Sequence, residues 1–206
     1  MYQEKEDTFV KDVYDKIAPH FDLTRAYQWK WVTDFTDQYS AAHTIIDIGC
    51  GNGRNMSKNT IGVDNCEAFV EMCKSRGHRA IKADMTDIPL PDHCADAIIS
   101  IASFHHLTTK ERRLQSLKEM VRLLKPNTGK ILLSVWSQDQ PKKTRRTFHY
   151  GANLVPWNKD GVIYERYYYI FTMDELNELF QDANLSIIDH TWDCGNEVFT
   201  LAPNKL

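Results

Sequence analysis

A cluster of glycines and aspartates is the part of this 206-residue sequence whose spacing most clearly indicates chemistry. The run Asp47-Ile-Gly-Cys-Gly-Asn-Gly53 places three glycines at alternate positions directly after an apolar segment. Glycines let a backbone approach a ligand closely. We expect residues 54–59 to form a short helix whose N-terminal amides attract negative charge. The G-x-G-x-G spacing differs from the G-x-G-x-x-G of dinucleotide folds.

Two further aspartates end the next two apolar segments. Asp64 lies 15 residues after Gly49, where a carboxylate can accept both hydroxyls of a ribose. Asp84 can accept an adenine amino hydrogen, with Met85 beside the ring. Taken singly, each feature is as compatible with a turn or a solvated helix cap as with a site. Together, three successive strand ends favour an adenosyl ligand, because ligands bind at the carboxyl ends of such strands.

Alternating strands and helices must position these residues. Apolar runs predict strands at 44–48, 61–64, 78–83, 95–102, 130–136, 185–190 and 197–202, the last two antiparallel. Helical spacing predicts helices at 7–19 (ended by Pro19), 27–39, 109–125 and 172–183. This alternation predicts an α/β fold around a mainly parallel sheet. We expect one domain, 1–206, with a helical N-terminal extension over 1–40.

Composition narrows the class of protein. The content of 42% hydrophobic and 26% charged residues indicates a globular chain, and no apolar run approaches the length of a membrane span. The five cysteines include no Cys-x-x-Cys pair, which argues against a disulfide framework or a zinc site in this chain. A net charge of −3 excludes a generally basic coat but not a local basic patch. Without a signal core, we expect a cytoplasmic protein, with the nucleus as a second location.

The glycine run and the aspartates that follow it resemble the class I S-adenosylmethionine-dependent methyltransferases. The resemblance implies a Rossmann-like, seven-stranded, mostly parallel sheet with an antiparallel last strand, and S-adenosylmethionine as cofactor. The residues that it assigns to the cofactor are Tyr14, Asp47, Gly49, Gly51, Gly53, Asp64, Asp84, Met85 and Ser100.

Other segments of the sequence indicate a particular family within this class. Ser100–Leu107 and the stretch from Tyr14 to Arg25 are its most specific parts, because glycine loops are shared by all relatives. In their order along the chain, these segments look like the tRNA wobble-uridine carboxymethyl methyltransferases. The resemblance implies esterification of the carboxylate of 5-carboxymethyluridine in the anticodon loop.

The chemistry of such a reaction fits the residues present. A carboxylate is already ionised at pH 7, so the protein must align it and exclude water rather than deprotonate it. Guanidinium groups hold carboxylates well. The resemblance assigns this task to Arg25 and Arg166, with His106, Trp136 and Tyr167 shaping the pocket. Without the resemblance, both arginines are more simply explained as surface or strand-flanking charges.

A basic and aromatic segment follows the fifth predicted strand. Its candidate RNA-binding residues are Lys142, Lys143, Arg145, Arg146 and Trp157. Cations contact phosphates and aromatic rings stack on exposed anticodon bases, although a run of four cations is equally typical of a solvated loop. We expect residues 137–170 to form a substrate-recognition insertion.

Two other functions remain open at this point. One is a methyltransferase acting on a small quinone or lipid-like molecule, against which the basic and aromatic segment argues. The other is a non-catalytic cofactor-binding subunit, against which the intact glycines and aspartates argue. The resemblance also implies a heterodimer with a small zinc-binding activator protein, which would pair along the sheet.

Overall fold

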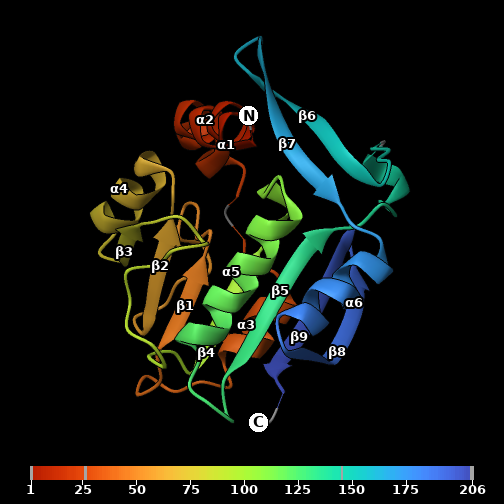
Figure 1. Ribbon diagram of the computed structural model, residues 1–206. Coiled ribbons are helices and arrows are strands. Elements are labelled where there is room, and N and C mark those ends of the chain that lie inside the picture. The colour runs from red at the N-terminus through yellow and green to blue at the C-terminus, as the bar shows by residue number, and fades with distance from the viewer. Residues whose placement is uncertain (1, 26, 145, 205–206) are drawn as a thin grey trace.

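A seven-stranded β-sheet runs through the middle of the protein (Figure 1). The computed structural model describes residues 2–25, 27–144 and 146–204. In spatial order, the strands are β3 (Arg79–Lys82), β2 (Thr60–Asp64), β1 (Ile45–Ile48), β4 (Ala97–Ile101), β5 (Lys130–Trp136), β9 (Asn196–Pro203) and β8 (Leu185–Asp193). The first five are parallel, β9 is antiparallel to β5, and β8 is antiparallel to β9. The predicted fold class is confirmed.

Helices surround this sheet. They are α1 (Tyr2–Glu6), the π-helical turn η1 (Asp7–Lys11), α2 (Asp12–Leu23), α3 (Lys30–Thr36), α4 (Glu67–Ser75), α5 (Lys110–Leu123) and α6 (Met173–Asp182), with short 3-10 turns η2 (Phe104–His106) and η3 (Lys142–Thr144). A capping box opens α6, where Thr172 and Glu175 each accept from the other's backbone amide. None of the described helices is long and apolar enough to cross a membrane.

Both faces of the sheet are covered, which is why its central strands are apolar on both sides. Ile46 of β1 packs into the large core cluster on the face covered by α5 and α6. Its neighbour Ile45 packs into a second cluster with Val32 and Phe35 of α3 on the opposite face. Alternation of side chains along β1 and β4 therefore supplies both cores. Figure 1 shows α5 and α3 on opposite sides of the sheet.

Two predictions about helices were wrong. Pro19 does not end the first amphipathic segment, because α2 continues through it to Leu23. A proline inside a helix costs about 3 kcal/mol, but here the following turn packs Phe21 against Tyr14 and Phe69. Residues 54–59 form turns instead of a helix, since only a short connection leads from Gly49 to β2. No helix N-terminus therefore follows the glycine loop.

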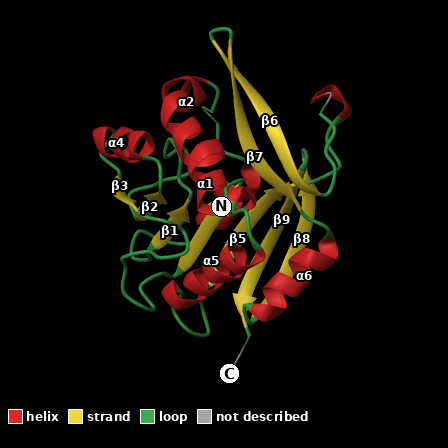
Figure 2. Ribbon diagram, turned by 45° about the horizontal axis from the view of Figure 1, so that its top comes forward, coloured by secondary structure: helices red, strands yellow, loops and turns green. Residues whose placement is uncertain are grey.

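A two-stranded hairpin, β6 (Gly151–Lys159) and β7 (Val162–Ile170), was not predicted. It stands apart from the main sheet and rises beyond the carboxyl ends of the parallel strands, next to α2 (Figures 1 and 2). Trp157 donates its indole N–H to Nδ1 of His20 at 3.0 Å, and Lys159 donates to the carbonyl of Lys16 at 2.7 Å. These bonds dock the hairpin onto α2.

Candidate active site

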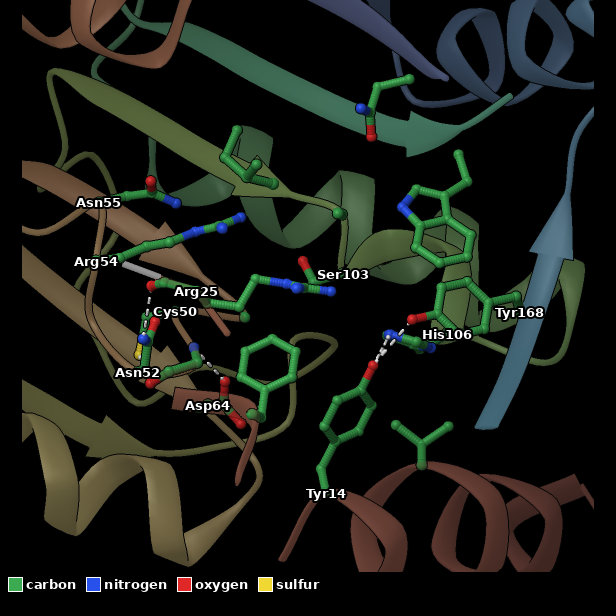
Figure 3. Close-up of a pocket in the computed structure, with 18 of the residues that line it drawn as sticks. Tyr14, Arg25, Cys50, Asn52, Arg54, Asn55, Asp64, Ser103, His106 and Tyr168 are labelled. Carbon is green, nitrogen blue, oxygen red and sulfur yellow. Dashed lines mark hydrogen bonds between the residues drawn. The ribbon is translucent and has the colours of Figure 1, made fainter. Parts of the chain in front are cut away.

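A cavity of about 630 Å³ lies at the carboxyl ends of the parallel strands, between the sheet, α2 and the hairpin (Figure 3). Its volume is within the range of about 300–1,000 Å³ that small-molecule sites occupy. The glycine loop and the ends of β2 and β3 line one end, called here the cofactor end. Tyr14, Arg25, His106, Trp136 and Tyr168 line the other, called here the substrate end.

The glycine loop at the cofactor end depends on close approach. Gly49 has φ +76°, and a Cβ there would lie 2.3 Å from Cβ of Ser103, so no larger residue fits without rearrangement. Gly51 has φ +52° and lines the cavity. Its amide donates to Oδ2 of Asp64 at 2.8 Å, which ties the loop to the end of β2. The loop thus offers bare backbone to a ligand.

Asp64 keeps acceptor capacity for such a ligand. One carboxylate oxygen accepts from Gly51 and the other accepts from the amide of Cys66 at 2.9 Å. Each ionised oxygen has a further lone pair. Burial raises the pKa of Asp64 to about 6, although the backbone amides oppose that shift. This geometry leaves room for the predicted ribose contact, which stays a prediction.

Asp84 is already engaged at the end of β3. Thr86 donates to one oxygen through its amide and hydroxyl, and Arg112 donates to the other at 2.6 Å. Burial opposes ionisation, but these donors outweigh it and lower the pKa of Asp84. Arg112 is held in turn by Glu6 at 2.9 Å. Asp84 and Met85 line the cavity, so a contact with an adenine ring remains a prediction.

Three of the predicted cofactor residues lie outside the cavity lining. Asp47 is fully buried in β1, and neither of its oxygens has a hydrogen-bond partner among the described residues. Burial and the nearby Asp64 charge raise the pKa of Asp47 to about 7. Ser100 is buried and shares a hydrogen bond of 2.9 Å with the hydroxyl of Ser103, which does line the cavity. Gly53 packs near Cys73. These residues lie behind the cavity lining, and their contact with the cofactor stays a prediction.

At the substrate end, four side chains from three elements form a buried network, and Figure 3 shows three of them, Tyr14, His106 and Tyr168. Tyr14 of α2 lies 3.1 Å from Nε2 of His106 and 3.1 Å from the hydroxyl of Tyr168. Arg166 donates to the Tyr168 hydroxyl at 2.9 Å. Burial and the Arg166 cation lower the pKa of His106 to about 4, so the imidazole is neutral at pH 7. Burial, with Tyr168 adding to it, raises the pKa of Tyr14.

Side-chain alternation along β7 decides which residues reach the cavity. Tyr168 lines it, and Arg166 lies two residues away on the same face, where it is 2% exposed and sits 4.7 Å from the Trp157 ring centre. Arg166 therefore does not line the cavity, and its direct contact with substrate stays a prediction. Tyr167 does not shape the pocket wall as predicted, because its side chain points to the opposite face of the strand. It offers only its carbonyl, which accepts from Nδ1 of His106 at 2.6 Å.

Arg25 lines the cavity and is half-buried. Its guanidinium donates to the carbonyl of Thr24 at 3.1 Å and lies 5.1 Å from the Phe21 ring centre. No carboxylate pairs with it in the parts of the chain that the structure describes. Burial is the main reason that the pKa of Arg25 is lowered, and the charges of Arg166 and Arg146 add to the effect.

The predicted RNA-binding residues are only partly brought together. Lys143 and Arg146 line the rim of the cavity, and Arg146 lies 4.9 Å from the Trp136 ring centre. Lys142 is exposed beside them but does not line the cavity. Trp157 faces α2 instead. Arg145 lies outside the described residues.

Comparison with known proteins identifies the family to which this fold and cavity belong. A family profile described as "Methyltransferase domain" matches residues 46–133. The tRNA (carboxymethyluridine(34)-5-O)-methyltransferase of Schizosaccharomyces pombe is 34% identical over 94% of this chain and 95% of its own length. The chain belongs to the tRNA (carboxymethyluridine(34)-5-O)-methyltransferase family. The predicted class, an S-adenosylmethionine-dependent methyltransferase, and the predicted cofactor are confirmed.

Several other relatives of this methyltransferase are longer. The chain is 39% identical to the bovine "Probable tRNA methyltransferase 9B" over 75% of its residues but spans only 34% of that relative's length. Among solved structures, a methyltransferase of Methanosarcina mazei superposes with a TM-score of 0.69 at 16% identity, over 87% of this chain and 99% of that one. A complex of the Haloferax volcanii Trm112 activator with a methyltransferase superposes with a TM-score of 0.67, at 16% identity, over 96% of this chain and 98% of that one. At these identities, the superpositions show the fold alone.

The lining residues of the methyltransferase that were not predicted from the sequence include Tyr168 and Arg54. Tyr168 could have been found from the period of two in a strand, because it shares a face with Arg166. Arg54 directly follows the glycine run and lines the cavity. It was not predicted as a lining residue because residues 54–59 were expected to form a helix. The residues that are present fit S-adenosylmethionine, because the loop is open at Gly51 and Asp64 retains free lone pairs.

Proposed function

We propose that this methyltransferase transfers a methyl group from S-adenosylmethionine to the carboxylate of 5-carboxymethyluridine at the wobble position of tRNA. The observation that carries the proposal is an unbalanced charge at the substrate end. Arg25, Arg146 and Arg166 gather there, and within the described ranges no carboxylate pairs with any of them. Of these three, Arg166 is buried, and a buried charge left unpaired costs about 3–5 kcal/mol, so an anionic ligand near it is favoured.

The neighbouring groups suit an ionised nucleophile. His106 is neutral, and both of its nitrogens are engaged in hydrogen bonds, so it is not positioned to take a proton from substrate. A carboxylate has no proton to give, so none needs to be taken. S-adenosylmethionine supplies a sulfonium methyl group when bound. The chain's own task is to hold one carboxylate oxygen through Arg25 and to exclude water with aromatic walls such as Trp136.

The tRNA itself would be held by the segment before the hairpin. Lys142, Lys143 and Arg146 are exposed next to the cavity mouth, where phosphates flanking an inserted nucleotide would pass. We therefore propose that residues 137–170, including the hairpin, act as the substrate-recognition insertion. The name of the fission yeast relative supports a tRNA substrate.

A protein partner is part of the proposal. A small zinc-binding activator subunit would pair along an open edge of the sheet, as the resemblance implies. The edge strand β8 carries exposed Ile187, Ile188 and Trp192, an apolar surface that a partner could cover. The archaeal relative seen with an activator supports the idea. A purified single chain that is monodisperse and fully active would contradict it.

The function is tested with cofactor labelled in its methyl group and bulk tRNA that lacks the methyl ester. We expect the label in the methyl ester of 5-carboxymethyluridine, released as methanol by mild alkali, because esters are alkali-labile. Alkali-stable label in another nucleoside would contradict the proposal. Label in a small-molecule fraction would favour the quinone or lipid alternative. Cofactor binding without transfer to any acceptor, with and without a co-expressed activator, would favour the non-catalytic subunit.

A further inference from the structure

The hydrogen bonds at the substrate end can run in only one direction. Nδ1 of His106 lies 2.6 Å from the carbonyl of Tyr167, which can only accept, so Nδ1 carries a proton. In a neutral imidazole, Nε2 is then an acceptor, and Tyr14 must donate to it. With its proton used, Tyr14 accepts from Tyr168. The Tyr168 oxygen accepts from Arg166.

The two phenols differ in how free their protons are. If Tyr14 turned its proton away, Nε2 of buried His106 would lose its donor, and a buried unsatisfied acceptor costs about 1–3 kcal/mol. If Tyr168 turned its proton away, the Tyr14 oxygen would still take part in its own bond to His106. Tyr168 is therefore the phenol whose proton can be redirected at small cost.

The surroundings fix the ring of Tyr168 and leave its hydroxyl able to turn. Trp136 stacks on the ring with centres 4.2 Å apart and planes at 23°. His106 packs edge-on at 4.6 Å. Turning the O–H bond moves only its proton, because the oxygen stays on Arg166. A cation that donates to a phenol oxygen makes that phenol a stronger donor.

We propose that Tyr168 recognises the substrate carboxylate directly, by turning its hydroxyl from Tyr14 to the carboxylate while Arg166 holds its oxygen. Arg166 is then a positioning residue that acts through Tyr168. The assignment rests on the proposed function, since it names the donor for the same carboxylate. It also explains why a buried guanidinium lies close to the cavity without lining it.

The test compares two anticodon stem-loops of nearly equal size, one with the anionic 5-carboxymethyluridine and one with its neutral amide, 5-carbamoylmethyluridine. Binding is measured by fluorescence anisotropy with S-adenosylhomocysteine present, so that no transfer occurs. The wild type should prefer the carboxylate. Tyr168→Phe should reduce this preference about tenfold, because a hydrogen bond to a charged group is stronger than one to a neutral group. Tyr164→Phe, on the same strand but outside the cavity lining, is the matched control and should leave the preference unchanged.

Two further variants separate the roles within the network. Tyr14→Phe removes the alternative acceptor, so the preference for the carboxylate should be kept or increased. Arg166→Lys should lower it less than Tyr168→Phe does, because an ammonium can still donate to the phenol oxygen. Should Tyr168→Phe fail to fold, 3-fluorotyrosine incorporation provides a second measurement. The ¹⁹F signal of Tyr168 should shift more with the carboxylate stem-loop than with the amide.

Each outcome has a distinct meaning. A wild-type preference that is unchanged in Tyr168→Phe, or equal ¹⁹F shifts with both stem-loops, would overturn the assignment of Tyr168 and leave the proposed function standing. A wild type without any preference for the carboxylate would overturn the proposed function and this assignment with it.

Discussion

The two ends of the cavity are built in different ways. The cofactor end consists of backbone and strand-end carboxylates, and it comes from residues 49–52 with the ends of β2 and β3 close behind them in the sequence. The substrate end is assembled from side chains of α2, η2, β5 and β7, as Tyr14 and Tyr168 show, because they are 154 positions apart in the sequence. The first end is thus encoded locally. The second exists only after the hairpin has docked onto α2, so it should be the easier end to perturb selectively.

The largest effect should come from filling the glycine loop. Gly49→Ala places a methyl group 2.3 Å from Cβ of Ser103 at φ +76°, which combines overpacking with a left-handed backbone. We expect a loss of about 2–4 kcal/mol in stability and no measurable cofactor binding. Gly77→Ala is the matched control, since φ is +81° there but nothing lies within 4 Å of the new Cβ. Calorimetry and thermal unfolding check both, and equal losses would show that the close approach is unimportant.

At the substrate end, the buried His106 should make the wild type lose more stability in acid than a His106→Asn variant does. An unfolded histidine has a pKa of about 6.5, whereas His106 in the fold has about 4. Between these values, the unfolded state binds the proton more readily. The contribution of His106 to the free energy of unfolding is therefore fully present above pH 6.5, and it falls by up to about 3 kcal/mol as the pH drops to 4.

The variant is needed as a reference because other groups titrate nearby. Tyr14, Tyr168, Arg166 and His105 face His106, and the pKa of buried His105 is lowered as well. Unfolding by urea at pH 7 and pH 4.5 should show the wild type losing more stability than His106→Asn. Equal losses would mean that His106 is not held neutral.

At the cofactor end, Asp64→Ala should weaken S-adenosylmethionine binding by about 2 kcal/mol, because carboxylate hydrogen bonds contribute about 1.5–3 kcal/mol. The same change also frees the amide of Gly51. Asp34→Ala, an exposed aspartate of α3, is the control. Unchanged affinity in Asp64→Ala by calorimetry would remove Asp64 from the ribose site.

The smallest effect concerns the rim of the substrate end. Changing Lys142, Lys143 and Arg146 to Gln should weaken tRNA binding and lower its salt slope by about 2, with cofactor binding intact. The surface triple Lys58, Lys74 and Lys118 serves as the charge-matched control. If both triples show the same slope, the rim cations form only a solvated loop.

The same contrast explains what could be predicted from the sequence. The parallel strands and the glycine run were predictable, because buried strands appear as continuous apolar segments ending in turn residues. The hairpin was not, since its outer face exposes Leu154 and Ile163 and its pattern did not resemble a buried strand. Because the alternation of side chains along β7 was not recognised, Tyr167 was predicted in the pocket where Tyr168 lies. The prediction that Pro19 ends the helix was wrong, because the packing of the following turn outweighed the tendency of proline to end helices.

One measurement tests most directly whether the two ends act separately. Methyl transfer to a 5-carboxymethyluridine stem-loop is measured in a single turnover at saturating cofactor, for the wild type and Arg25→Ala, together with the calorimetric Kd for S-adenosylmethionine. We expect at least a tenfold loss of transfer with a Kd within about twofold of the wild type, since Arg25 would hold only the substrate carboxylate. Near-wild-type transfer, or a loss of cofactor affinity as large as the loss of rate, would contradict this account.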